Sequence, residues 1–401
     1  MPMTKQRSKR TRRAFLGTVG VSASALAGCA GSGGGEGGGE TTSSGGTETT
    51  MSGGNGTGGG GNGTMMGSSG SESMADSITI FHAGSLAPPM EEAEAAFEEE
   101  TGIQVNREAE GSVASTQKIT QQGRSADVLG VSDYRLLRDQ LLPQYGNWYS
   151  VFVTNSMTIA YTQQSAGAGE ISPENWGEVL ARDDVRFAHS DPAADPNGYR
   201  SVMSMQLGMM DFQGSSLYGE DVYNTLREKE IVPTGTETAL IGQLQAGSLD
   251  YAWNYASIQA TEDVQIVDLQ PRLDLSRVAP EFAQFYANAE VQAGGETYTG
   301  APIAYGITVP NVAEAPQAGA RFVQFLLSEG GDRIMTNAGF SALNPAVIPS
   351  SAQQAVPGSL SDLVEAQDSL GPLELEIGRQ PVSFGTKAKE ALTRTPPELV
   401  L

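Results

Sequence analysis

Short apolar runs alternate with amphipathic segments from Ser77 onward, and this alternation constrains the fold more than any other feature. Residues 78–81 contain Ile, Thr, Ile and Phe and predict a short buried strand. Met90, Ala93 and Phe97 follow at helical spacing with glutamates between them, which predicts a helix with one buried face. Alternating strands and helices favour a parallel sheet that is covered on both faces.

The alternation continues along the chain. We expect two long β-rich runs, at 149–161 and 303–309, to provide the strands that cross between two lobes. After residue 363 the pattern decays into Gly, Pro and scattered charge, and we expect 366–401 to be a loose tail. The other expected strands are 103–106, 126–131, 185–189 and 251–253, and the other expected helices are 112–121, 176–181, 199–210, 238–246 and 320–328.

The first 28 residues have the features of an export signal. Arg12 and Arg13 are followed by Phe-Leu and then by a small, apolar run too short to span a bilayer comfortably, which is typical of a twin-arginine signal. Residues 26–29, Leu-Ala-Gly-Cys, resemble a lipobox. We therefore expect cleavage before Cys29 and lipid attachment to its sulfur. The alternative is a free cysteine in an uncleaved signal.

Residues 29–75 consist almost entirely of Gly, Ser, Thr, Asn and Glu. A segment without an apolar face cannot form a core, so we expect a tether. A Gly-rich coil of this length reaches roughly 35–40 Å. Asn55 and Asn62 begin matches to the glycosylation pattern, but such matches arise easily in a tract of this composition.

The charge and the cysteine count exclude several functions. The 401-residue chain has a formal charge of −23, which is typical of a protein from a salt-loving organism and also fits a merely solvated acidic surface. Nucleic acid is not expected as a partner, because no basic excess remains to neutralise phosphates. One cysteine allows no intrachain disulfide. With only two histidines, far apart in sequence, a zinc site of Cys and His is excluded.

Three junctions that precede helices are small and rich in hydroxyl or polar groups: residues 83–85, 111–112 and 195–198. Helix N-termini offer unpaired N–H groups and partial positive charge, and ligands of open α/β sheets bind at such junctions. Gly84 would let the backbone approach a ligand, and Ser85 would add a hydroxyl donor. The three junctions together could hold an oxyanion. Taken singly, the first two are also explained as N-caps and the third as a β-turn.

Several ordered segments resemble the archaeal tungstate/molybdate substrate-binding proteins of ABC transporters. The resemblance extends over residues 77–365. The segments that carry it are His82 to Leu86, Gly111 to Val113, Ala126 to Val128, Ser132 to Tyr134, Trp148-Tyr149, Ile159 to Thr162, Asp195 to Arg200 and Ile303 to Val309.

The resemblance implies an α/β, two-lobed fold of the periplasmic-binding-protein type II class, with a helix-flanked sheet in each lobe and crossing strands between them. The lobes would comprise 76–154 with 305–365, and 155–304. Ser85 and Ser112 would be hydroxyl donors to the oxyanion, and Asp195 would ligate its Mo or W atom.

The family pattern implies a second carboxylate, a Glu, at the position of Asn254. Asn is a poor metal ligand, so we expect the Mo or W atom of the bound oxyanion to have fewer than six ligands, in a near-tetrahedral arrangement. The alternative is that Asn254 lies outside the site. Tyr255 beside it is an expected site residue, and Tyr199, Tyr255 and Trp253 would either line the cleft or belong to a lobe core.

We therefore expect a monomeric binding protein without a cofactor, anchored by lipid at the outer face of the cell membrane. It would capture tungstate or molybdate and deliver the ion to an ABC permease. Sulfate or phosphate is an alternative cargo within the same class. An exported hydrolase would need a base such as His82, and a purely structural surface protein would bind no oxyanion.

Overall fold

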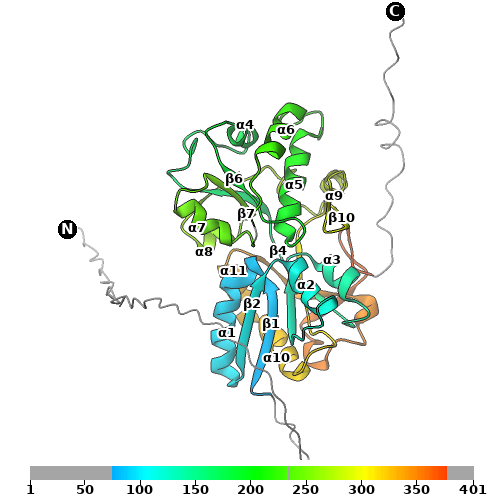
Figure 1. Cartoon of the computed structure of the whole chain (residues 1–401). Helices are drawn as coiled ribbons and strands as arrows, with labels where there is room; N and C mark the ends of the chain where they lie inside the picture. The colour runs from blue at the N-terminus through cyan, green and yellow to red at the C-terminus, as the bar shows by residue number, and fades with distance from the viewer. Residues whose placement is uncertain (1–74, 234, 377–401) are drawn as a thin grey trace, which may run out of the picture. The chain divides into compact units, whose positions relative to one another are not determined.

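Two sheets organise the folded part of the chain. The computed structural model describes residues 75–233 and 235–376, so the expected signal, Cys29 and nearly all of the tether lie outside the described residues. A seven-stranded sheet forms the core of one lobe and a four-stranded sheet the core of the other (Figure 1). We name them the large-sheet lobe and the small-sheet lobe. The predicted two-lobed α/β fold is confirmed.

The large sheet has the strand order β13-β12-β4-β11-β3-β1-β2. Its strand β1 pairs in parallel with β2 and β3, so the carboxyl ends of these three strands meet at one edge. Strand β11 runs antiparallel to β3 and β4. The strands are β1 (Ser77–Ala83), β2 (Gln104–Glu110), β3 (Val128–Val131), β4 (Ser150–Thr154), β11 (Ala304–Thr308), β12 (Ser341–Pro349) and β13 (Val364–Gln367).

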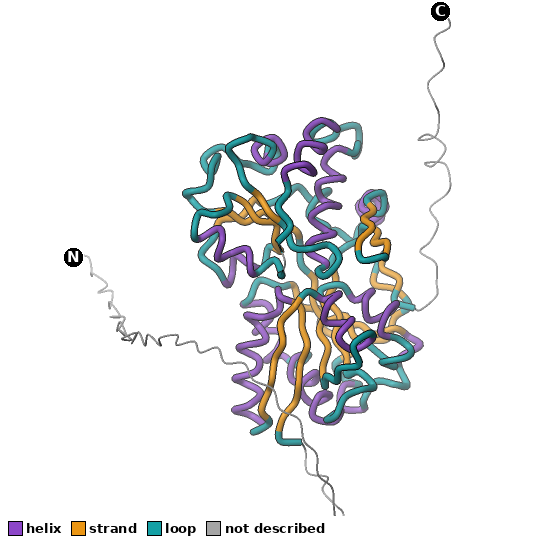
Figure 2. Tube along the Cα trace, viewed as in Figure 1, coloured by secondary structure: helices purple, strands orange, loops and turns teal. Residues whose placement is uncertain are grey.

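Helices flank this sheet (Figure 2). The predicted buried face of α1 is confirmed, because Met90, Ala93 and Phe97 are fully buried. The helix has proline in its first turn and ends at Gly102, whose φ of 74° suits glycine. No helix within the described ranges is long and apolar enough to cross a membrane. The helices of this lobe are α1 (Ala87–Thr101), α2 (Ser112–Thr120), α3 (Tyr134–Leu136), α10 (Pro316–Leu326) and α11 (Glu329–Asn337).

The small sheet has the order β6-β7-β5-β8, and the chain enters it between Thr154 and Met157. Trp253 and Trp176 pack edge to face in its core, with ring centroids 5.2 Å apart. Helix α5 packs on β7 and β5. The elements are β5 (Met157–Tyr161), α4 (Trp176–Leu180), β6 (Phe187–Ala188), α5 (Pro196–Met209), α6 (Glu220–Lys229), α7 (Ala239–Gln245), β7 (Tyr251–Tyr255), α8 (Ile258–Thr261) and β8 (Gln265–Val267), followed by α9 (Pro280–Tyr286), β9 (Glu290–Ala293) and β10 (Glu296–Thr299).

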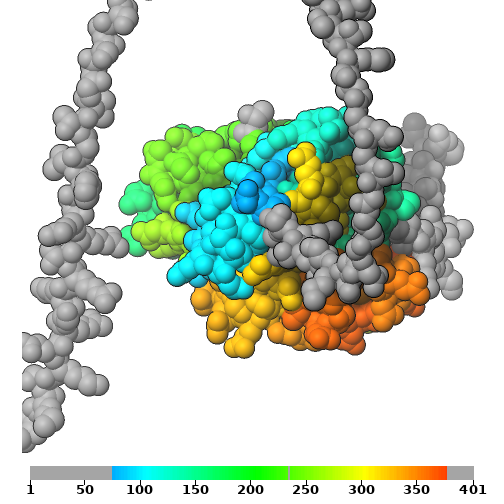
Figure 3. Space-filling view, turned by 90° about the horizontal axis from the view of Figure 1, so that it is seen from below, coloured from blue at the N-terminus to red at the C-terminus, as the bar shows by residue number. Residues whose placement is uncertain are grey.

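The expected loose tail at 366–401 is wrong for its first part. Strand β13 pairs in parallel with β12, and β14 (Ser369–Leu370) and β15 (Leu373–Glu374) form a short hairpin. Leu375 is fully buried, and its carbonyl accepts a hydrogen bond of 2.6 Å from the Tyr149 hydroxyl. A few apolar residues thus dock against the sheet although the composition resembles a tail. The C-terminal described strands, coloured orange to red by residue number, form part of the surface seen in Figure 3. Residues 377–401 lie outside the described residues.

Candidate functional site

The three predicted junctions lie around the edge of the large sheet where β1, β2 and β3 end. Ser85 follows β1, and Ser112 opens α2 directly after β2. Asp195 is the N-cap of α5 in the small-sheet lobe. The amide of Ala114 in α2 donates a hydrogen bond of 3.2 Å to the carbonyl of Ala194. The second and third junctions therefore meet across the two lobes.

Two glycines mark places where the lobes approach closely. A Cβ atom on Gly111 would lie 2.3 Å from the carbonyl oxygen of Ala194, and one on Gly84 would lie 2.7 Å from the side chain of Thr236. The φ of Gly111 is −59°, which any residue can adopt, so glycine is needed there for space alone. The described conformation is therefore a closed one.

The two serines differ in how their hydroxyl groups are bonded. The Ser85 Oγ lies 3.0 Å from the hydroxyl of Tyr305, a buried residue of β11. The Ser112 Oγ accepts a hydrogen bond of 2.9 Å from the amide of Ser132 and lies 3.1 Å from the Ser132 Oγ. Both serines are buried. Ser112 therefore also connects the ends of β2 and β3.

Asp195 holds together two segments of the small-sheet lobe. Its Oδ1 accepts from the amide of Asn197, which caps α5, and its Oδ2 accepts from the amide of Glu237. These donor–acceptor distances are 3.2 and 3.4 Å, and Asp195 is only 2% exposed. Because the second bond is long, this oxygen has acceptor capacity to spare.

Glu237 is a candidate site residue that the sequence analysis missed. It is 1% exposed, and neither carboxyl oxygen has a hydrogen-bond partner in the described residues. Burial first, and then the charge of Asp195, raise its pKa well above the ordinary value, while Ser85 acts in the opposite direction. Its signal in the sequence is Gly235-Thr236-Glu237 before α7, a fourth small, hydroxyl-containing junction.

Asn254 lies beside Glu237, and its side-chain amide is bonded to backbone groups. Its Nδ2 donates to the carbonyl of Glu237 at 3.2 Å, and its Oδ1 accepts from the amide of Tyr255 at 2.8 Å. Both polar atoms of the amide are therefore engaged with the backbone. Asn254 holds the segment that presents Glu237, while the Tyr255 hydroxyl accepts a 2.8 Å bond from Arg200.

Of the other aromatic candidates, Trp253 belongs to the core of the small-sheet lobe, whereas Tyr199 is buried where the two lobes meet. Trp253 is fully buried against Trp176, and Tyr199 stacks on Tyr298 with centroids 4.1 Å apart. His82 is fully buried as well, its Nε2 has no partner among the described residues, and burial lowers its pKa to about 4. It forms no pair with a hydroxyl nucleophile there, so nothing at His82 favours a hydrolase.

A cavity of about 780 Å³ lies away from the junctions. Its walls include Asp133, Arg138 and Glu374, and neither Ser85 nor Asp195 lines it. Its lining is mostly apolar and joins α3, α9, β10 and the hairpin of β14 and β15. The polar groups at the three junctions, together with the buried carboxyls of Asp195 and Glu237, form a better candidate than this cavity for a small anion site.

Comparison with known proteins gives consistent results. The model of the family described as bacterial extracellular solute-binding protein matches residues 78–341. An uncharacterized solute-binding protein of Methanoculleus marisnigri is 38% identical over 313 residues, covering 72% of this chain and 86% of that protein. The molybdate/tungstate-binding protein WtpA of Pyrococcus abyssi is 36% identical over 323 residues, covering 73% and 90%. WtpA of Thermococcus kodakarensis is 35% identical over 323 residues, covering 73% and 88%.

Proposed function

Because the chain belongs to the bacterial extracellular solute-binding protein family, we propose that it captures molybdate or tungstate outside the cell and delivers the ion to an ABC permease. Two similar proteins are named for binding these two ions. The chain acts as a binding protein, not as an enzyme. Cys29 holds it on the outer face of the membrane through a lipid, and the tether gives the lobes their reach.

The observation that supports this cargo most directly is the meeting of two buried carboxyl groups, those of Asp195 and Glu237. A carboxylate beside sulfate is repelled, because sulfate has no proton to donate and its sulfur atom does not accept a further oxygen ligand. Mo and W in their oxyanions are electrophilic and can accept one. Two carboxyls facing the ion therefore favour molybdate and tungstate over sulfate.

Neutral donors complete the site. The helices α2 and α5 begin at it, so the partial positive charge of their N-termini faces a bound anion. The first amides of α5 are engaged within the protein, because Pro196 has no N–H and the amides of Asn197 and Gly198 donate to Asp195. The Ser85 and Ser112 hydroxyls and the backbone at Gly84 contribute further contacts, and Tyr255 closes the side nearest to Arg200. With Glu237 as the second carboxyl, we expect six-coordination in place of the near-tetrahedral arrangement that Asn254 alone suggested.

Calorimetric titration of the full-length chain at high salt tests this function. Molybdate, tungstate, sulfate and phosphate are compared on one preparation. We expect one of the two metal oxyanions to bind at least about 100-fold more tightly than sulfate, a difference of about 2.7 kcal/mol. Equal affinity for sulfate or phosphate would make one of them the cargo. If none of the four ions gives heat or shifts the melting temperature, the protein would be a purely structural surface protein.

The role of Glu237 is tested with Glu237→Gln. This variant keeps the size of the side chain but removes a carboxylate, so affinity for the metal oxyanion should fall by about 100-fold. Asp274→Asn is the matched control, because Asp274 is also buried in the small-sheet lobe but bonds to Ser276. It should bind the ion like the wild type. Wild-type affinity in Glu237→Gln would contradict the two-carboxyl site.

A further inference from the structure

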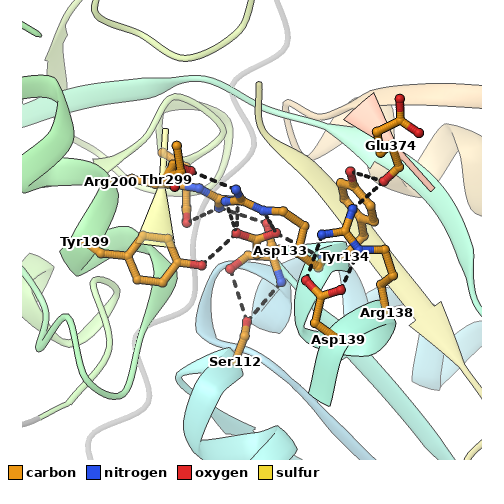
Figure 4. A network of polar contacts seen from close by, with 12 residues as sticks. Ser112, Asp133, Tyr134, Arg138, Asp139, Tyr199, Arg200, Thr299 and Glu374 are labelled. Carbon is orange, nitrogen blue, oxygen red and sulfur yellow. Dashed lines mark hydrogen bonds and ion pairs between the residues drawn. The ribbon is translucent and has the colours of Figure 1, made fainter. Parts of the chain in front are cut away.

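A buried ion pair joins the two lobes next to the candidate site. Arg200 belongs to α5 of the small-sheet lobe, and Asp133 is the N-cap of α3 in the large-sheet lobe. The Arg200 Nη2 and the Asp133 Oδ2 are 3.2 Å apart, and each side chain is 2% exposed. The Tyr199 hydroxyl donates to the same oxygen at 2.7 Å. Figure 4 shows Tyr199 and Arg200 reaching Asp133 together.

The two partners depend on this contact to different degrees. Asp133 has a second cation in its own lobe, because Arg135 donates to its Oδ1 at 2.9 Å and to its Oδ2 at 2.6 Å. Arg200, by contrast, forms its ion pair with Asp133, which belongs to the other lobe. Separating the lobes therefore leaves Asp133 paired with Arg135, whereas Arg200 loses its acidic partner and becomes hydrated on the face of α5.

Arg200 also contacts both sides of the candidate oxyanion site. Its Nη1 donates to the Ser132 carbonyl and to the Tyr255 hydroxyl, each at 2.8 Å. Ser132 is bonded to Ser112. One guanidinium thus connects the end of β3, which supports Ser112, with the end of β7.

If the lobes closed out of register, Arg200 would be buried without its carboxylate partner Asp133. A buried charge that has lost its partner costs about 3–5 kcal/mol, so the closed state is favourable only when the two lobes are in register. A guanidinium matches a carboxylate and a carbonyl at once through its planar fork, and an ammonium does not. The contact therefore specifies one closed geometry.

We propose that Asp133 and Arg200 form an inter-lobe latch that makes and breaks with lobe closure and sets how long the bound oxyanion is retained. Asp133 and Arg200 are positioning residues in this role, since Arg200 acts through Ser132 and Tyr255, and Asp133 acts through Arg200. The proposal rests on the proposed function for the identity of its ligand. The latch opposes release of the ion and leaves its capture by the open lobes unchanged.

The experiment compares the wild type with Asp133→Asn in the full-length chain. The substitution keeps the size of the side chain and an acceptor for Arg135 but removes the charge that faces Arg200. Asp139→Asn is the matched control, because the pair of Asp139 with Arg138 lies within one lobe. Stopped-flow measurements with molybdate and tungstate give the association and dissociation rates.

Lobe closure is measured in the same variants by the distance between two spin labels. Ala95 in α1 and Asn224 in α6 are exposed and lie on different lobes, so Ala95→Cys and Asn224→Cys carry the labels in a Cys29→Ser chain. With saturating ion, the wild type and Asp139→Asn should give one closed distance. Asp133→Asn should retain a population at the distance seen without ion.

We expect the dissociation rate of Asp133→Asn to rise by about tenfold or more while its association rate stays within about threefold of the wild type. Arg200→Lys keeps the charge but loses the fork, and should release the ion at an intermediate rate. A dissociation rate and closed distance equal to the wild type in both variants would overturn the latch alone. A wild type that binds none of the oxyanions would instead overturn the proposed function.

Discussion

Gly111 offers a direct test of the closed conformation. In Gly111→Ala the new methyl group would lie 2.3 Å from the Ala194 oxygen and 2.8 Å from the Ala194 carbonyl carbon, which are backbone atoms of the other lobe. Alanine tolerates the local backbone, with φ −59° and ψ 140°, so the large-sheet lobe itself gains no strain. The clash exists only when the lobes are closed.

Overpacking of this kind costs about 1–3 kcal/mol, which corresponds to roughly 5- to 150-fold weaker binding. Calorimetry with molybdate or tungstate measures the affinity, and thermal melting without ion measures the stability of the open form, which should change little. Gly169→Ala is the control, because nothing lies within 4 Å of its Cβ position. Binding within about twofold of the wild type in Gly111→Ala would refute the idea that ion binding requires this close approach.

Three further predictions follow from single residues. Ser85→Ala removes a hydroxyl donor to the oxyanion and should weaken binding by about 1.5–3 kcal/mol in calorimetry; unchanged affinity would remove Ser85 from the site. Burial holds the pKa of His82 at about 4 instead of 6.5, so the unfolded chain takes up the proton first and stability should fall by up to about 3 kcal/mol between pH 6.5 and 4. Denaturant unfolding at several pH values measures this pH dependence of the unfolding free energy. The dependence should be lost in His82→Gln, and an unaltered dependence would mean that other groups cause it. Phe97→Ala empties a fully buried position beside Phe322 and should cost about 3–5 kcal/mol in the same assay, whereas a loss below about 1 kcal/mol would contradict the packing.

The alternation of strands and helices could be predicted because it depends on local periodicity. Helix α1, which has Pro88 and Pro89 in its first turn and Gly102 as its C-cap, is one example. The tail was mispredicted for a related reason. The few apolar residues around Leu373 and Leu375 show no period, and only contact with distant segments, at Tyr134 and Tyr149, makes their burial favourable.

The site shows the same division. Ser85, Ser112 and Asp195 could be proposed from the sequence, because short polar junctions before helices have a local signature. Glu237 could not be chosen from among 47 acidic residues, since what distinguishes it is burial beside Asp195 without a partner. Asn254 was assigned to the ion from its position in a motif, but the structure engages its amide with backbone groups.

The sequence by itself determined the order of the elements and the polar junctions, since both follow from interactions between residues near one another in the chain. The tertiary structure decided which charges meet. Arg200 is 67 positions from Asp133, and no local pattern indicates that pairing. It exists because two separately folded sheets bring α3 and α5 together, and burial makes an unpaired charge there unfavourable.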